Sequence, residues 1–212
     1  MATTPSVVTG AAPVPFKDFV IGDRDAAQQD DPLALREHAG AVSALPSNPK
    51  LRLRCYQGTW VLEPWVPGII AIQRGAFFTP RDGDVVLASP PKCGTTWLKA
   101  LAFVIMARGV HPPAGHPEHP LLRLNPHDCV PFMEKLFATE WGSQAMEALP
   151  SPRLMHHSVL PASISENPHC KIVYICSSSC TEAGEAGAAA SLKCWREQLT
   201  RLEQGDRTHV VR

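Results

Sequence analysis

The clearest pattern in the chain is an apolar stretch followed by apolar positions at helical spacing. Residues 84–89, DVVLAS, begin with an acidic side chain and continue with a run of apolar ones, as in a strand covered on both faces. After a short loop, apolar residues recur every three or four positions up to Gly109, a residue suited to end a helix. These positions are Trp97, Leu98, Leu101, Ala102 and Ile105. The pattern predicts a strand, a loop and a helix, in that order.

Later segments continue this alternation. Residues 132–141 and 143–149 have the pattern of short helices. Residues 153–160 and 171–176 are predicted strands, and the second, KIVYIC, is rich in β-branched residues. Strands separated by helices are typical of an α/β domain with a mainly parallel sheet. We expect a three-layer domain of this class.

The first part of the chain has a different character. Residues 1–50 are rich in Ala, Pro, Asp and Gln and contain one amphipathic helix candidate, at 32–45. We expect the rest of this segment to be a largely irregular leader. Residues 51–66 are β-prone and aromatic, which predicts one short strand, and a helix is expected at 68–78.

Charge and composition exclude several classes of function. Twenty basic residues balance twenty acidic ones, so no basic excess favours nucleic acid or an anionic membrane as partner. No signal-peptide pattern is present, and no apolar run approaches the roughly 20 residues that span a bilayer. Seven cysteines without a CxxC pair fit reduced thiols better than disulfides. We expect a cytoplasmic protein with, at most, a local anion site.

The loop between the strand and the helix is the candidate for that site. It reads PPKCGTTW, residues 90–97. The N-terminus of a helix presents unpaired N–H groups and partial positive charge, and Gly94 would let a phosphate or sulfate come close to them. Lys92 adds a cation, and Thr95 and Thr96 add hydroxyl donors that we also expect to cap the helix. Because the lysine precedes the glycine, the spacing disfavours a Walker-type NTPase.

These residues carry a resemblance to a known family. The segment PKCGTTWLKAL resembles the PKSGTTW phosphosulfate-binding loop of cytosolic sulfotransferases, with Cys93 in place of the commoner serine. EPWVPGIIAIQRGAFFTPRDGDVVLASPPK upstream, HPLLRLNPHDCVPFME downstream, and SPRLM followed by HSVLPASI look like successive segments of the plant branch. The resemblance therefore indicates a partial sulfotransferase domain at 51–176, between the leader at 1–50 and a divergent tail at 177–212.

The resemblance implies a P-loop-like fold and a reaction. The family transfers a sulfuryl group from 3′-phosphoadenosine 5′-phosphosulfate (PAPS) to a hydroxyl of a small acceptor, such as a flavonoid or a steroid-like hormone, without a catalytic metal. Lys92 would contact the phosphosulfate and stabilise charge on the departing phosphate. The N–H groups of Cys93, Gly94, Thr95, Thr96 and Trp97 would hold the 5′-phosphate.

The stretch that supplies the family's general base departs from the usual pattern. Where plant members have LLATHxPxSLLP, this chain has LMHHSVLP, which is about four residues shorter. His156 is the candidate base, because it lies at the right place and an imidazole has the right chemistry. The alternative is that His156 and His157 are two polar residues at the end of a shortened strand.

A second departure begins at Ser177. The family's KIVYxC strand is followed by R-[DE]-P-K-D, whose arginine binds the nucleotide 3′-phosphate, whereas SSSC follows here. Residues 177–212 carry no strand signal, although Leu192, Trp195, Leu199 and Leu202 could line a helix. We therefore expect a domain incomplete at its C-terminus, which fits a truncated or alternatively spliced product.

Three functions remain open. The first is a sulfotransferase. The second is a catalytically inactive fragment that binds nucleotide weakly or associates with a full-length relative or with a second copy of itself. The third, a nucleotide kinase or another P-loop NTPase, rests only on shared folds.

Overall fold

The computed structural model describes residues 12–20, 33–74, 78–90, 93–113, 117–158, 169–175 and 209–210. The helices are α1 (Phe16–Val20), α3 (Leu33–Ser43), α4 (Val66–Gln73), α5 (Thr95–Ala107), α6 (Pro126–Cys129), α7 (Met133–Leu136) and α8 (Glu140–Ala148), with 3-10 turns η2 (Glu63–Trp65) and η3 (Pro120–Leu122). The strands are β1 (Ser47–Asn48), β2 (Leu53–Tyr56), β3 (Thr59–Leu62), β4 (Asp84–Ala88), β5 (Leu154–His157), β6 (Cys170–Tyr174) and β7 (His209–Val210).

The larger sheet has the strand order β5-β4-β6-β7, and every neighbouring pair is parallel. Strand β4 lies inside it, with Leu87 opposite His156 on β5 and Val173 on β6. A strand flanked by neighbours and covered on both faces needs apolar residues at successive positions, which explains the DVVLA pattern. The predicted parallel sheet is confirmed, and the three predicted strands are present as β4, β5 and β6.

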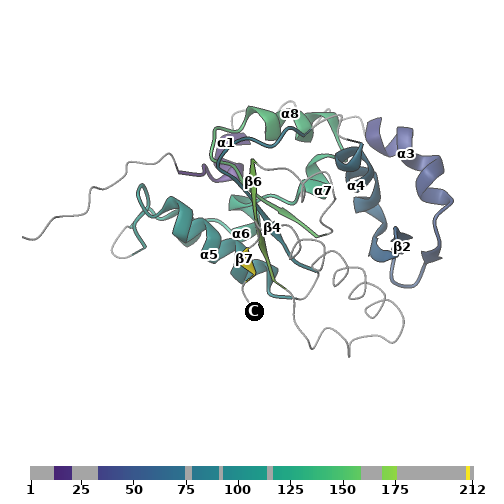
Figure 1. Ribbon diagram of the computed structural model, residues 1–212, viewed down its shortest axis with the longest axis horizontal. Helices are drawn as coiled ribbons and strands as arrows, with labels where there is room; N and C mark the ends of the chain where they lie inside the picture. The colour runs from purple at the N-terminus through teal and green to yellow at the C-terminus, as the bar shows by residue number, and fades with distance from the viewer. Residues whose placement is uncertain are drawn as a thin grey trace, which may run out of the picture.

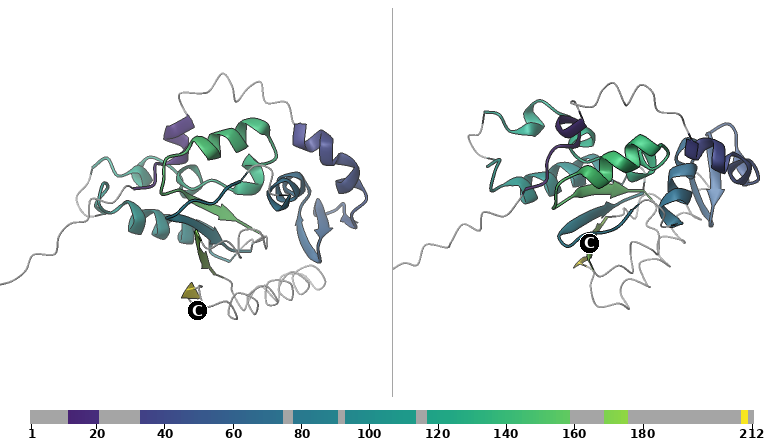
Figure 2. Two further views of the ribbon diagram at one scale, coloured as in Figure 1. Left: turned by 45° about the horizontal axis from the view of Figure 1, so that its top comes forward. Right: turned by 90° about the horizontal axis from the view of Figure 1, so that it is seen from above.

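The sheet separates two apolar cores, and this confirms the three-layer arrangement. Figures 1 and 2 show the strands between α5 on one side and α8 on the other. On the α8 side, the strands contribute Val86, Ala88, Met155, Ile172 and Tyr174, which pack with Met133, Leu136, Phe137, Met146 and Leu149. On the α5 side, Leu87 and Leu154 pack with Phe103, Ala107, Cys129 and Val130. Alternate residues of each strand therefore serve opposite layers.

The predicted helices are present with shifted boundaries. Helix α3 lies within the predicted range, and α5 begins where the threonines predicted it. The helix expected at 68–78 begins instead at Val66, because Pro67 fits the first turn of a helix, and it ends at Gln73. A Cβ on Gly68 would lie 2.0 Å from the backbone oxygen of Glu134, so this glycine allows α4 to lie against α7.

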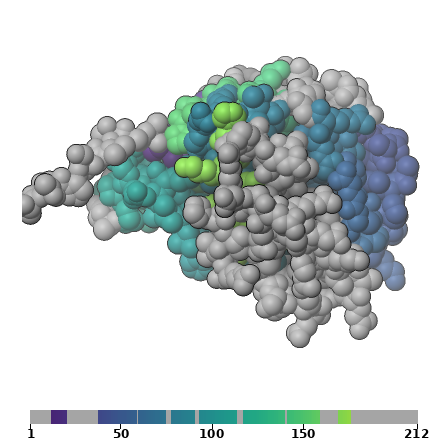
Figure 3. Space-filling model, viewed as in Figure 1, coloured from purple at the N-terminus to yellow at the C-terminus, as the bar shows by residue number. Residues whose placement is uncertain are grey.

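A second sheet was not predicted. Strands β1, β2 and β3 form an antiparallel sheet where we expected a single strand. Gln57 and Gly58 form the two-residue turn between β2 and β3, with φ values of 49° and 80°, as in a type I′ hairpin. Val61, Ile69 and Val42 share a separate core beside this sheet. Figure 3 shows this blue part of the molecule on the side away from the teal α5 region.

The described parts of the leader and the tail contain short elements that were not predicted. Besides α3, the leader contains α1, whose Phe16 is buried in the core on the α8 side of the sheet. Ion pairs of Lys17 with Asp128 (3.0 Å) and of Asp18 with Arg123 join α1 to the domain surface. In the tail, β7 adds two residues beside β6. The predicted helical stripe at 192–202 lies outside the described residues.

Candidate functional site

The turn between β4 and α5 presents an open helix N-terminus. Gly94 immediately precedes the helix, and its φ of 86° lies in the left-handed region that glycine adopts without strain. Having no side chain, Gly94 cannot accept hydrogen bonds from the first N–H groups of α5. A Cβ built on it would meet none of the described atoms within 4 Å. The N–H groups and the space beside them can therefore receive an anion.

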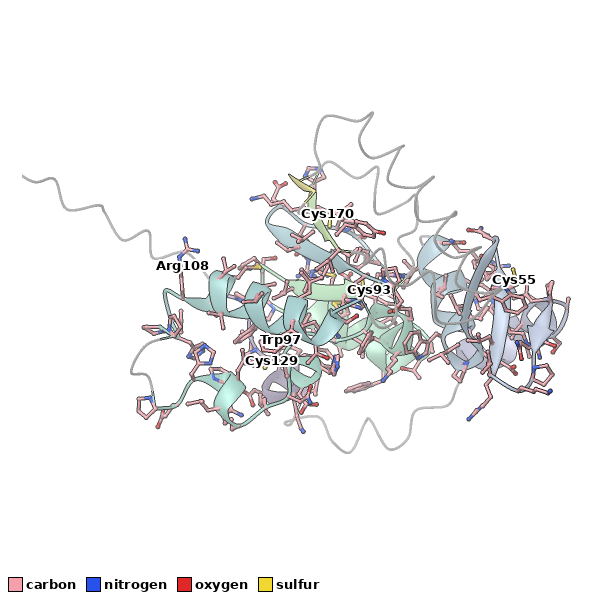
Figure 4. All side chains as sticks on the ribbon, turned by 90° about the horizontal axis from the view of Figure 1, so that it is seen from below. Cys55, Cys93, Trp97, Arg108, Cys129 and Cys170 are labelled. Carbon is pink, nitrogen blue, oxygen red and sulfur yellow. The ribbon has the colours of Figure 1, made fainter. Side chains whose placement is uncertain are left out.

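Other residues of the predicted loop have different surroundings. Lys92 lies outside the described residues, so its role remains a prediction. Cys93 is buried, whereas the Trp97 side chain is 76% exposed. Figure 4 shows Cys93 before α5, Trp97 on the helix and Arg108 at its far end. The indole therefore offers an accessible aromatic face one turn from the helix N-terminus.

The two threonine hydroxyls contact neighbouring side chains, which corrects their expected role as helix caps. The Oγ1 of Thr95 lies 2.7 Å from the Oγ of Ser89, the residue that follows β4. The Oγ1 of Thr96 lies 3.3 Å from Nε2 of His127. Gly94 occupies the capping position itself, because only a residue tolerant of positive φ fits there. The hydroxyls join the first turn of α5 to β4 and α6.

His156 lies below this turn, on the α5 side of β5. Its Nε2 lies 2.9 Å from the Oγ of Ser89, and both residues are completely buried. Its backbone N–H donates to the oxygen of Pro131 at 3.0 Å. Burial, and secondarily the charge of Lys99, lower the pKa of His156 well below its usual range. The ring is therefore neutral at pH 7, and its role as general base remains a prediction.

A buried lysine completes this region. Lys99 lies one turn after Thr95 on the inner face of α5 and is fully buried. Its Nζ donates to the oxygen of Val130 at 2.8 Å and lies 3.3 Å from the centre of the Phe132 ring. Desolvation lowers its pKa to about 6, although the nearby Glu134 carboxylate opposes this shift. Near neutral pH this amine is therefore largely uncharged.

The Phe132 ring links these groups from the β5 side. It stacks on His127, with ring centres 5.1 Å apart, and meets the edge of His156 at 4.9 Å. Trp65 of η2 also stacks on it, at 5.6 Å. Lys99 and His156 are thus surrounded by aromatic rings, which keep water from the buried amine and imidazole.

Comparison with known proteins finds similarity to sulfotransferases. Residues 82–179 match the sulfotransferase domain. The chain is 42% identical over 125 residues to cytosolic sulfotransferase 12 of Arabidopsis thaliana, and 37% identical over 155 residues to cytosolic sulfotransferase 7 of that plant. Over the matched residues, this chain is similar to plant-type cytosolic sulfotransferases.

A solved sulfotransferase structure agrees with this similarity. The crystal structure of a putative steroid sulphotransferase of Arabidopsis thaliana superposes with a TM-score of 0.57 at 32% identity, over 86% of this chain and 60% of that one. The alignments with the two curated sulfotransferases cover 57% and 70% of this chain, but only 37% and 45% of those proteins. The chain thus spans less than half the length of these curated relatives.

The sulfotransferase fold brings most of the predicted residues together. The described part of the loop, Cys93–Trp97, and His156 meet at the carboxyl ends of β4 and β5, where open α/β sheets bind ligands. No described helix has both the length and the hydropathy of a bilayer-spanning segment. The contacts of Ser89 and Lys99 were missed. The burial of Lys99 could have been predicted from its spacing. It lies four positions after Thr95 and four before Phe103, on the helix face that is directed toward the core.

Proposed function

We propose that the chain binds PAPS at the turn between β4 and α5 and transfers its sulfuryl group to a hydroxyl of a small acceptor. The observation that carries this proposal is the open N-terminus of α5, which lies within the PKCGTTW segment and inside the region that matches the sulfotransferase domain. Anions bind at such a terminus because the N–H groups and the helix dipole favour negative charge.

The loop residues would divide the work on the donor. The N–H groups of residues 94–97 would hold the 5′-phosphate, because the predicted donor of Cys93 is bonded to the oxygen of Pro90 at 3.3 Å. Lys92 would neutralise the charge that develops on the phosphate oxygen as the bond to sulfur breaks. A positioned cation and fixed N–H dipoles lower the barrier most when charge increases toward the transition state. The chemistry requires no resident metal.

Trp97 offers a place for the adenine ring. Its indole is 76% exposed at the first turn of α5, which is unusual for so large an apolar surface. Stacking of a base on an aromatic side chain contributes about 1–3 kcal/mol. We therefore assign Trp97 to the nucleoside part of PAPS.

The acceptor hydroxyl must lose a proton, and His156 has two alternative roles here: it is either this base or a residue that positions the loop. Its buried ring meets the loop through Ser89, and its lowered pKa weakens it as a proton acceptor. Replacing His156 by Gln tests this role: a base predicts turnover reduced at least 100-fold with nucleotide affinity unchanged.

Binding is tested by thermal unfolding of the purified chain with 3′-phosphoadenosine 5′-phosphate, using ATP as the control ligand. A ligand at a hundredfold excess over its Kd stabilises the folded state by about 2.7 kcal/mol. We expect an upward shift of Tm for the first nucleotide only. The shift should disappear in Lys92→Ala and persist in Lys50→Ala, a change at an exposed lysine outside the parallel sheet. No shift at millimolar nucleotide would reject the proposal.

Turnover separates the enzyme from its alternative. Sulfate transfer from PAPS to a panel of phenols and hydroxysteroids, lost in Lys92→Ala, would support the full reaction. Selective binding without transfer to any acceptor would instead favour an inactive nucleotide-binding fragment. Magnesium-dependent ATP hydrolysis would favour an NTPase.

We place this activity in the cytoplasm, in keeping with the names of the curated relatives. A fluorescent fusion tests the location, and an organellar signal would contradict it.

Association with a second copy or with a full-length sulfotransferase is a further proposal. Sedimentation with and without the relative would test it.

A further inference from the structure

The buried contacts below α5 form a chain of three side chains that ends at the anion site. His156 Nε2 lies 2.9 Å from Ser89 Oγ, which lies 2.7 Å from Thr95 Oγ1. His156 and Ser89 are completely buried, and Thr95 is half-buried as the first residue of α5. Each hydroxyl has only one hydrogen to donate, so the direction of one hydrogen bond determines the next.

The first direction follows from the imidazole. Nδ1 of His156 is buried and has no hydrogen-bond partner among the described residues. A buried N–H without an acceptor is rarer and costlier than a buried lone pair without a donor. The hydrogen of the neutral ring therefore belongs on Nε2, from which it is donated to Ser89 Oγ.

The remaining directions follow in turn. Ser89 accepts from His156, so its own hydrogen is donated to Thr95 Oγ1. Thr95 accepts from Ser89, so its hydrogen is left for another acceptor. As the first residue of α5, Thr95 has no preceding helical turn whose carbonyl could accept it. The hydroxyl is carried on the same first turn as the N–H groups that face the open side of Gly94.

We propose that His156 and Ser89 are positioning residues, which orient the Thr95 hydroxyl as a hydrogen-bond donor to the anion bound at the N-terminus of α5. The imidazole acts in its neutral form and exchanges no proton with the substrate. Hydrogen bonds in series polarise one another, so the Thr95 donor is strengthened when the chain is intact. This inference rests on the anion role proposed above for the loop.

The tautomer of His156 is the first test, and it needs no ligand. Long-range ¹H–¹⁵N NMR spectra of the histidine rings at pH 7 should show His156 with hydrogen on Nε2. A ring with hydrogen on Nδ1 would reverse the chain and overturn the proposal, whether or not the protein binds PAPS. In Ser89→Ala the His156 signals should shift, whereas in Ser143→Ala, at a buried serine of α8, they should not.

Affinity is the second test, with 3′-phosphoadenosine 5′-phosphate and inorganic sulfate as separate probes. We expect Ser89→Ala and Thr95→Val to weaken both probes by about tenfold, the loss of one hydrogen bond to a charged group. Ser143→Ala should bind as the unchanged chain does. Unaltered affinity in Ser89→Ala would overturn the proposal.

Two substitutions of His156 separate positioning from base catalysis. Gln can donate from its amide near the place of Nε2, but it cannot take up a proton, and Leu can do neither. Positioning predicts that His156→Gln keeps affinity and turnover within about threefold while His156→Leu loses both together. If both variants bind nucleotide normally and lose turnover equally, His156 is the base.

Binding of the two probes to the unchanged chain distinguishes failure of the proposed function from failure of the positioning proposal. If sulfate binds and the nucleotide does not, the proposed function fails and the positioning of Thr95 is judged on sulfate alone. If neither binds, both are rejected.

Discussion

Strand β4 has two neighbours in the parallel sheet, and they are integrated very differently. On one side, all four residues of β5 are buried, and polar groups are bonded at both ends of the pair. These are Asp84 with Arg153 at one end and Ser89 with His156 at the other. On the other side, Lys171 of β6 is exposed and Val173 is only half-buried. Among the described residues, β5 is therefore the more deeply buried neighbour of β4, and β6 is the more exposed one.

The difference between β5 and β6 agrees with the position at which the sulfotransferase match ends. The match to the sulfotransferase domain ends at residue 179, shortly after β6, and the curated relatives extend well beyond their aligned parts. The candidate loop lies on the well-packed side, between β4 and α5. The buried contacts of β5 can thus preorganise a site even though β6 is more exposed.

Removing the ion pair at the start of β4 should have the largest effect. Arg153→Met leaves the carboxylate of Asp84, which is completely buried, without its guanidinium partner. Breaking a buried pair on one side costs about 3–5 kcal/mol. Urea denaturation measures the loss. Arg81→Met is the matched control, since Arg81 also bonds to the end of α8 but is one third exposed, and it should cost about 1 kcal/mol. Equal losses would contradict the contrast.

Lys99→Met should stabilise the chain. In the unfolded chain the amine has an ordinary pKa near 10.5, whereas in the folded state the pKa is about 6. Between these values folding releases a proton, so Lys99 lowers stability at pH 7 and the penalty fades as pH rises toward 10.5. We expect a gain of roughly 3 kcal/mol at pH 7 and less than about 1 kcal/mol near pH 9.5.

The same urea titrations at the two pH values test the Lys99 prediction. Lys135→Met, at an exposed lysine beside the same Phe132 ring, should change little at either pH. A gain that does not depend on pH would show that the amine is charged in the folded state.

A valine-to-alanine substitution on each of β4 and β6 compares the burial of the two strands directly. Val86 of β4 is completely buried, whereas Val173 of β6 is half-buried. Removing two methyl groups should cost about 2 kcal/mol in Val86→Ala and roughly 0.5 kcal/mol in Val173→Ala. Denaturation midpoints of the two variants measure the difference. A larger loss at Val173 would mean that further chain covers β6 in solution.

The smallest effect on folding should come from Lys171→Val. This exposed side chain has little packing to lose, so stability should remain within about 0.5 kcal/mol. Among the described strands, β7 pairs only with Val173 and Tyr174, and the outer edge of residues 170–172 has no partner. A charge on such an edge discourages association, so size-exclusion chromatography should show more oligomer in the variant. A monomer at all concentrations would argue that this edge is covered.

Much of the fold could be predicted from the sequence because it follows from local patterns. The apolar run at 84–88 and the helical spacing after Gly94 yielded β4 and α5 with nearly correct boundaries. The hairpin at 53–62 was missed because Gln57-Gly58 is a weaker turn signal than Asn-Gly, and two four-residue strands together resemble one. Helix α1 was missed because it is held by contacts distant in the sequence, the burial of Phe16 and the ion pairs of Lys17 and Asp18.

The site could be predicted only where its residues are contiguous. The loop at 90–97 is a local motif, so its residue types indicated an anion site before any fold was known. The pairing of Ser89 with His156 depends on the register between β4 and β5, which no local pattern specifies. The threonine hydroxyls were expected to cap α5, but tertiary neighbours occupy them.

Arg153 has a consequence for how the molecule opens. Its guanidinium donates to Asp84 on β4, to the Thr79 oxygen before that strand, and to Met146 and Glu147 on α8. Because one side chain bonds to all of these segments, they should unfold together. Their amide hydrogens should therefore exchange with solvent deuterium at a common rate. Helix α3 and strand β3, which contribute Val42 and Val61 to the separate core, are free to exchange as another unit.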